Sequence, residues 1–223
     1  MIDRLAAIAE GIERLESEEE RRLITDYRWL RPWKDDFLGQ VLQEQYTVEL
    51  SGGGSSVVLQ NNRHGGVVRL TSDSAVGSWA YLWLGNNAGF ATIDPDDGYE
   101  QICRAQLSHT TETFFSIASI QPGAANYVEV CCNTDWGNNW YIASDNDSLF
   151  VSYTDSGVAI DTDWHWHTMI ARSGRIEHLL DGQLINTHTT KVPTVAMTPF
   201  LRQRRRGNFV RYTDVNCWIV APE

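Results

Sequence analysis

The sequence lacks the features that carry a chain into or across a membrane. None of its apolar runs approaches the length of about 20 residues that a membrane-spanning helix needs. Its first residues, MIDRLAAIAEGIERLESEEERR, do not form a secretory signal, because acidic residues interrupt every apolar stretch. We therefore expect a protein that is made in the cytoplasm and has no membrane partner.

Cysteine is scarce, with four residues in a chain of 223. Cys103, Cys131, Cys132 and Cys217 fit no zinc-ligand spacing, and an adjacent pair rarely forms a disulfide with itself. Each of them alternates with apolar residues in a strand-like run. We predict four reduced thiols, mostly buried.

Positive charge is also in short supply, since 18 Lys and Arg face 29 Asp and Glu, for a formal net charge of -11. Phosphate backbones repel such a chain, which argues against general nucleic-acid binding. The exception is the run RQRRRG, with Arg202, Arg204, Arg205 and Arg206. This run is either a solvated strand end or loop, or a docking site for an acidic partner or a neighbouring subunit.

What is present is an ordinary globular composition, with 42% hydrophobic residues, in a chain long enough for one large domain or a domain with an appendage. The first 23 residues have helical periodicity, in which Leu5, Ile8, Ile12 and Leu15 form a heptad seam. The seam stops after about two heptads, which is too short for an isolated helix in water. The helix must therefore pack against its own domain, sister chains or another protein.

Residues 24–46 form an irregular aromatic connector, and Pro32 interrupts any continuous helix there. A solvated linker would be less aromatic, so we expect the connector to lie against a surface. We assign residues 1–46 to anchoring or to a homo-oligomer, either a trimer or a dimer. The contact residues that we predict are Leu5, Ile8, Ile12, Leu15, Trp29, Trp33 and Phe37.

From residue 47 the period changes to two, and about a dozen short strands follow, separated by Gly, Pro and Asp turns. Residues 47–223 are therefore predicted to form an all-β sandwich or barrel. In RSGR and LDGQ, two-residue hairpin turns are predicted at Ser173-Gly174 and Asp181-Gly182. The segment before the first of these turns, WHWHTMIAR, carries bulky side chains on both faces, which predicts an inner strand.

The order of several segments resembles the concanavalin A-like lectin/glucanase superfamily. The segments are GGVVRLTSDSAVGSWAYLWLG, YEQICRAQLS, NNWYIAS, DSGVAIDTDWHWHTMIA, RIEHLLDGQLINTHTTKVPTVAMTPFL and VNCWIVAPE, and the DWH strand followed by LLDGQLI is the most specific of them. The resemblance implies a concanavalin A-like jelly roll over about residues 47–221, preceded by the helix and connector. These segments also look like the version of the fold that is found in tailed-bacteriophage virion proteins.

On this fold, a retaining glycosidase needs two carboxylates about 5 Å apart, typically as Glu-x-Asp-x-x-Glu or Glu-x-Asp-x-Glu on one strand. We find no such spacing, and the strand motifs of a polysaccharide lyase are also missing, so we do not expect an enzyme. His165 and His167 share a strand face, either as a packed pair or as part of a metal site. Calcium at an oxygen cluster is the one cofactor that remains open. That cluster would comprise Asp94, Asp96, Asp97 and Glu100.

Aromatic residues supply the candidate binding sites. Trp79, Tyr81 and Trp83 line one face of a strand whose other face is Ala80, Leu82 and Leu84. If the aliphatic face is core, the aromatic row is a sugar-stacking platform or a protein interface; if the aromatic row is core, it indicates no ligand. Trp136 and Trp140 either form part of a carbohydrate site or close one end of the sandwich.

The function that we expect from these features is a non-catalytic bacteriophage virion structural protein, a capsid decoration or fibre-like subunit. Its missing leader, reduced thiols and unpartnered helix fit a particle assembled in the host cytoplasm from this chain and other virion proteins. Residues 1–46 would anchor it, and the jelly roll would face solvent. The alternative is a carbohydrate-binding module or adhesin that recognises host-surface polysaccharide.

Overall fold

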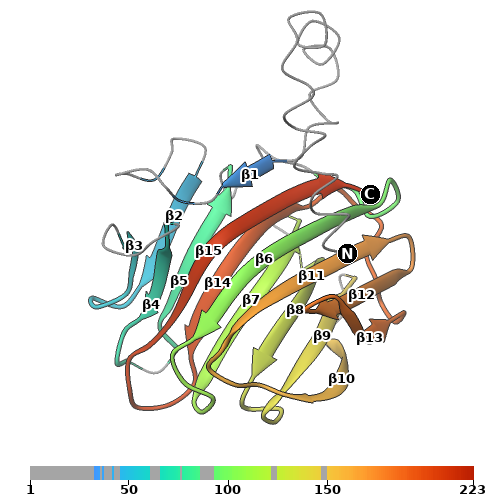
Figure 1. Cartoon of the computed structure of the whole chain (residues 1–223). Coiled ribbons are helices and arrows are strands. Elements are labelled where there is room, and N and C mark those ends of the chain that lie inside the picture. Colours follow the sequence, from blue (N-terminus) through green and yellow to red (C-terminus); the bar gives the residue numbers. More distant parts are fainter. Residues whose placement is uncertain are drawn as a thin grey trace, which may run out of the picture.

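A computed structural model of the chain describes residues 33–35, 37, 42, 46–60, 66–75, 77–85, 93–121, 125–146 and 150–223. These residues form two antiparallel sheets stacked face to face, as Figure 1 shows. The structure is an all-β jelly-roll sandwich, which confirms the fold class that the alternating pattern predicts. The predicted N-terminal helix lies outside the described residues.

Sheet A has eight strands, and seven of them follow the order β13-β12-β11-β6-β15-β4-β3 while β1 pairs with β15. Their bounds are β1 (Trp33–Asp35), β3 (Ser56–Leu59), β4 (Val68–Ser72), β6 (Tyr99–Leu107), β11 (Trp164–Arg172), β12 (Arg175–Leu180), β13 (Gln183–His188) and β15 (Arg211–Pro222).

Sheet B has seven strands in the order β10-β9-β8-β7-β14-β5-β2. Their bounds are β2 (Tyr46–Ser51), β5 (Trp79–Leu84), β7 (Thr113–Ile120), β8 (Tyr127–Asn133), β9 (Asn139–Asp145), β10 (Ser152–Ala159) and β14 (Thr198–Arg205). Sheet B has an inner face, which packs on sheet A, and an outer face, which points away from it.

The main hydrophobic core lies between the sheets, where every second side chain of each strand points inward. Leu70 of β4 and Trp218 of β15 meet Leu82 of β5, Phe115 of β7 and Leu201 of β14 in this core. All of these side chains are fully buried. Burial of such large apolar groups is the dominant stabilising contribution to a sandwich of this kind.

The central meander matches its prediction closely. β11 ends at Arg172 and β12 starts at Arg175, so Ser173-Gly174 is the two-residue turn. The next turn is Asp181-Gly182, with φ angles of 45° and 89°. β11 also lies between β12 and β6, which confirms it as an inner strand.

One strand differs from its prediction. β14 spans the Arg-rich run, which the sequence pattern left as a solvated strand end or loop or as a docking site, and it lies between β7 and β5 in sheet B. β10 starts at Ser152. Its pattern alternates between half-buried and exposed residues throughout, as is typical of a strand at a sheet edge.

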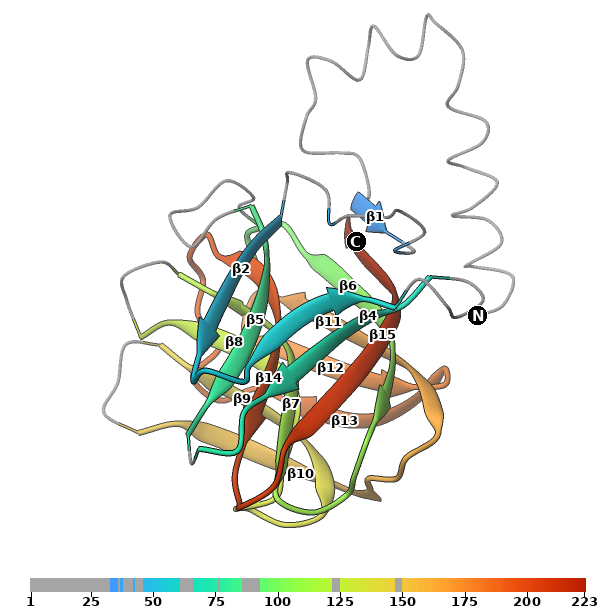
Figure 2. The ribbon, with the colours of Figure 1, turned by 90° about the vertical axis from the view of Figure 1, so that its left-hand side faces the viewer.

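The predicted boundary between residues 46 and 47 cuts into elements of the sandwich. Tyr46 begins β2, and Phe37 is 3% exposed and belongs to the main core. β1 pairs with the C-terminal part of β15, from Trp33 opposite Val220 to Asp35 opposite Trp218, and Figure 2 shows the two side by side. Phe37 thus packs within its own domain. Leu5, Ile8, Ile12, Leu15 and Trp29, and the side chain of Trp33, lie outside what the structure describes.

All four cysteines are free and buried, as predicted. Burial raises the pKa of Cys103, Cys131 and Cys132 above the ordinary thiol value, so none of the three is an activated nucleophile. Among the described residues, no helix is long and apolar enough to span a membrane.

Candidate functional site

The aromatic row of β5 lies on the outer face of sheet B. Its aliphatic neighbours Ala80, Leu82 and Leu84 point into the core between the sheets. Trp79 and Tyr81 are half-buried, and their rings stack with centroids 4.5 Å apart. Trp83, by contrast, is 6% exposed, packs against Phe200 and donates a hydrogen bond from Nε1 to Glu49 at 3.2 Å. The part of the row available for stacking is therefore Trp79 and Tyr81.

A second aromatic group lies on the other side of the same face, near β9 and β10. The ring of Trp136 stacks on exposed Tyr153, with centroids 4.5 Å apart and planes 8° from parallel. Tyr141 of β9 meets Trp136 edge-on at 5.5 Å. Trp140 is placed differently: it is 2% exposed, lies in the core and contacts His167, so it takes no part in this surface.

Between the two aromatic groups, Glu129 of β8 forms an ion pair with Arg202 of β14. The side chain of Glu129 is 3% exposed, and Arg202 also donates from Nε to the Ser116 hydroxyl at 3.2 Å. Burial lowers the pKa of Arg202, but the carboxylate of Glu129 and the hydroxyl of Tyr81 outweigh it, so the pKa is raised. Arg202 is therefore charged at neutral pH.

Glu129 is a site residue that the sequence reading missed. It begins the pattern Glu-x-Cys-x-Asn on the outer face of β8, formed with Cys131 and Asn133. This is the spacing of Glu-x-Asp-x-Glu with one carboxylate kept. Asn133 serves the next turn instead: its Oδ1 accepts the Asp135 N–H at 3.2 Å, and its carbonyl accepts the Trp136 N–H at 2.9 Å. The signal that could have identified it in the sequence is a Glu at the first of these three alternating positions.

The Arg-rich run is neither a loop nor uniformly solvated. Arg202 and Arg204 lie on the outer face of sheet B, in register with Tyr81 and Trp79 of β5. Arg206 lies beyond the strand end, with its Cζ 5.0 Å from the ring centroid of Phe114, and pairs with Asp135 at 3.0 Å.

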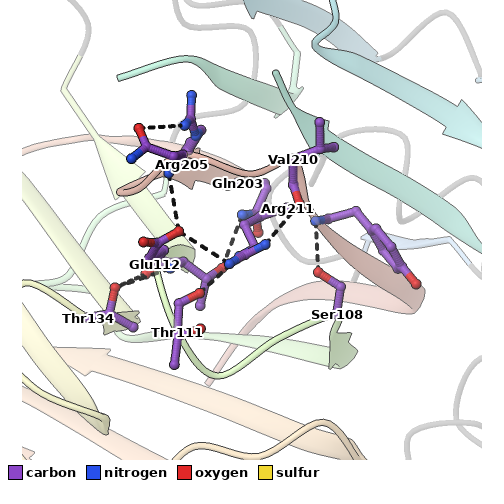
Figure 3. Close-up of polar contacts among 11 residues, drawn as sticks. Ser108, Thr111, Glu112, Thr134, Gln203, Arg205, Val210 and Arg211 are labelled. Atoms are coloured by element: carbon purple, nitrogen blue, oxygen red, sulfur yellow. Dashed lines mark hydrogen bonds and ion pairs between the residues drawn. The ribbon is translucent and has the colours of Figure 1, made fainter. Parts of the chain in front are cut away.

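Arg205 points the other way and is 1% exposed. Its Nη2 donates to Asn208 at 3.5 Å, beside a polar network in which Arg211 donates to the Thr111 carbonyl at 2.9 Å and pairs with Glu112 (Figure 3). This group holds the end of the sandwich and is separate from the outer face.

The histidines of β11 do not come together as metal ligands. His165 contacts Asp181 at 2.6 Å and Asp161 at 2.9 Å. His167 is buried, with its Nδ1 3.2 Å from Nε2 of His178, and burial lowers the pKa of both rings, that of His178 to about 3. His167 and His178 are therefore neutral packing groups near pH 7.

The acidic turn at residues 94–100 is built by its own hydrogen bonds. The Asp94 carboxylate accepts the Asp96 N–H at 3.0 Å, and its carbonyl accepts the Asp97 N–H at 3.2 Å. In the part of the chain that the structure describes, no group of three or more His, Cys, Asp or Glu side chains is placed to hold a metal ion.

The sequence matches no protein-family model, and no curated protein matches it. Solved structures share its fold. The Bacillus licheniformis β-glucanase is 13% identical, with a TM-score of 0.60 over 86% of this chain and 98% of that one. A glycoside hydrolase family 16 endo-glucanase from Bacteroides ovatus is 12% identical, with a TM-score of 0.64 over 84% of this chain and 99% of that one.

A third structure, an immunostimulatory antigen and pseudo β-1,3-glucanase of Mycobacterium tuberculosis, is 12% identical, with a TM-score of 0.63 over 87% of this chain and 99% of that one. At these identities the likeness shows the fold alone, a jelly-roll sandwich like that of these glucanases.

These neighbours contradict the expected non-catalytic virion structural protein, because they are glucanases and a glucanase-like protein and point to carbohydrate-active function. The same finding contradicts the expectation that the chain is not an enzyme. The virion and capsid setting has no support among them. That expectation depended on the N-terminal segment, the reduced thiols and a likeness to phage virion proteins, none of which carries information about a ligand. Carbohydrate binding, the alternative, agrees better with the neighbours.

Proposed function

We propose that this chain is a carbohydrate-active protein that binds a polysaccharide along the outer face of sheet B. The observation that carries the proposal is the pair of aromatic groups on that face. Trp79 and Tyr81 lie at one side, Trp136 and Tyr153 lie at the other, and the Glu129 ion pair lies between them. Flat rings accept the apolar faces of sugars, and a few polar groups between rings fix the orientation of a ligand.

The fold supports this assignment without deciding it, since one fold hosts many functions. The support specific to this chain is the division of its aromatics. Trp140 and Trp218 are buried between the sheets and Trp83 is buried against Phe200, whereas Trp79 and Trp136 are only half-buried. Accessible tryptophans on one sheet face are the groups available to a sugar chain.

The test is affinity electrophoresis of the full chain in gels that contain laminarin, barley β-glucan or pectate. We expect at least one polysaccharide to retard it. Trp79→Ala and Trp136→Ala should each weaken that binding by about tenfold, because a lost ring interaction is worth roughly 1 kcal/mol beyond its buried area. Trp164→Ala is the matched control, since Trp164 lies on the outer face of sheet A beside Arg104.

Two results would contradict the proposal. The first is that no polysaccharide in the panel retards the folded chain. The second is that Trp164→Ala weakens retardation as much as Trp79→Ala does, which would mean that the outer face of sheet B is not the binding surface.

Glycosidic-bond cleavage is a second candidate, and the position of Asp145 favours it. Tyr127 of β8 lies opposite Asp145 of β9, so Glu129 and Asp145 are diagonal neighbours on the same outer face. Diagonal neighbours have backbone positions roughly 7–8 Å apart, so the two residues lie beside the same stretch of the face, and a glycosidase likewise works with a pair of carboxyl groups. Burial, together with Glu129 and Asp145, raises the pKa of Tyr127.

Cleavage is tested by release of reducing ends from the polysaccharide that the chain retains. Glu129→Gln and Asp145→Asn should each abolish release while binding persists. Asp155→Asn is the control, because Asp155 of β10 is exposed and accepts hydrogen bonds from Asn139 and from its own turn. Release that survives Glu129→Gln excludes this mechanism.

A further inference from the structure

The outer face of sheet B carries a column of three arginines beside its aromatic rings. β14 is an inner strand of sheet B, and the period of two in its sequence sends Arg202 and Arg204 to the outer face. Arg206 continues the column, as its contact with the ring of Phe114 shows. Such a row of guanidinium groups is the exception on a chain of net charge -11.

The charges of this column are only partly neutralised. Arg202 pairs with Glu129, and Arg206 pairs with Asp135, whose side chain is half exposed. Among the described residues, no acidic side chain forms an ion pair with Arg204. The Nε of Arg204 is buried and has no hydrogen-bond partner there. The side chain of Arg204 as a whole is half-buried, so part of it is accessible to a ligand.

The three guanidinium groups also act on one another. Burial, followed by the positive charge of Arg204, lowers the pKa of Arg206, and the Asp135 carboxylate opposes this effect. An anion placed against Arg204 would relieve the repulsion. A planar carboxylate suits a guanidinium group, since the two can form parallel hydrogen bonds.

Arg204 lies where a bound sugar would pass. In the register of sheet B it is opposite Trp79 on β5 and Phe114 on β7, and Trp79 stacks with Tyr81 at 4.5 Å. A sugar ring on Trp79 therefore has a cation as its lateral neighbour. A neutral glucan has no group that uses this charge, whereas a uronic acid carries a carboxylate on its ring.

We propose that the ligand of this face is an acidic polysaccharide, whose uronate carboxylate binds Arg204 while its sugar rings stack on Trp79 and Tyr81. The proposal rests on the proposed function and narrows its ligand class. It also gives the Arg-rich run its role, as a site for an acidic partner of carbohydrate type.

The experiment compares matched ligands on the full chain by isothermal titration calorimetry. A β-1,4-linked glucuronan hexamer and cellohexaose differ only at C6, and polygalacturonate and its methyl ester form a second pair. We expect the charged member of at least one pair to bind about tenfold more tightly or better, the contribution of one charge-assisted hydrogen-bonded pair.

Arg204→Gln should remove this preference and leave the affinity for the neutral member unchanged. Arg204→Lys should keep part of it, because charge remains without the planar fork. Arg175→Gln is the control, since Arg175 is exposed in the β11–β12 hairpin and pairs with Glu177.

Equal affinity for both members of each pair overturns the inference, and so does a preference that survives Arg204→Gln. In both cases the proposed function stands if Trp79→Ala weakens binding by about tenfold. If neither pair binds and no polysaccharide retards the chain in gels, the proposed function and the inference fail together.

Discussion

Each sheet of the sandwich carries a buried carboxylate paired with an arginine on its outer face, and the two pairs differ in what surrounds them. On sheet A, Arg69 donates to Asp214 from Nε at 2.7 Å and from Nη2 at 2.8 Å. Its guanidinium lies over Tyr212, with Cζ 3.8 Å from the ring centroid. On sheet B, Arg202 pairs with Glu129 and lies 4.3 Å from the ring centroid of Phe114.

The difference is in the balance of charge. Arg69 and Asp214 form a closed bidentate pair in which both oxygens of the carboxylate are occupied. Arg202 stands beside Arg204 and Arg206, and these three cations share two paired carboxylates among the described residues. A closed pair holds two strands in register. An excess of one charge type beside accessible rings is the arrangement that a ligand can complete.

The largest expected effect comes from breaking either pair. Arg69→Leu and Arg202→Leu should each lower the free energy of unfolding by about 3–5 kcal/mol, because each leaves a buried carboxylate without its counter-charge. Urea denaturation followed by tryptophan fluorescence measures the loss. The double variants Arg69→Leu/Asp214→Leu and Arg202→Leu/Glu129→Leu should regain most of it. A loss below 1 kcal/mol at either site would show that its carboxylate is not held by the pair.

An intermediate effect comes from pH and involves neither outer face. His167 and His178 lie between the sheets, and burial lowers the pKa of both below the ordinary histidine value. The unfolded chain therefore takes up protons first as the pH falls below about 6.5, and stability drops by up to about 1.4 kcal/mol per pH unit for each histidine. His178 reaches its folded pKa only at about 3, so the loss continues over the acid range.

Urea midpoints between pH 7.5 and 5 test this dependence. His178→Leu should flatten the slope, and His109→Leu, at an exposed turn, should not. A slope that is unchanged in His178→Leu would assign the acid sensitivity to other groups. Binding measurements are best made above pH 7, where protonation of these histidines does not lower the stability of the fold.

The smallest effect is expected at Arg204. Arg204→Gln should change the free energy of unfolding by less than about 0.5 kcal/mol, because it removes a buried donor that has no partner among the described residues. The same urea measurement, with Arg175→Gln beside it, checks this. A loss of 2 kcal/mol or more would make Arg204 a structural group like Arg69 and would remove the contrast between the faces.

The sequence predicted the sandwich well because its strands obey local rules. Alternation identified the central meander, and Asp181-Gly182 marked a turn that needs positive φ angles. Alternation also showed that Trp79 and Ala80 must lie on opposite faces, but not which face is core. That choice depends on the strands that pack against β5, which are distant in sequence.

The candidate site was harder to predict for the same reason. Glu129 and Arg202 are separated by 73 residues and meet only when β8, β7 and β14 are placed side by side. The Arg-rich run was interpreted by its charge, although Gln203 and Leu201 alternate with its arginines as they do in a strand. Trp140 and Tyr141 are adjacent in β9, and both faces of this strand carry bulky side chains. Alternation alone therefore could not show that Trp140 faces the core and Tyr141 the outer face.

The strand order has a consequence for synthesis on the ribosome. β14 and β15 come after the other strands of this sequence, yet each occupies an interior position, β15 between β6 and β4 and β14 between β7 and β5. Before residues 198–222 have been translated, the strands on either side of β14 and of β15 lack the strand that joins them. We therefore expect the nascent chain to depend on chaperones until β14 and β15 emerge.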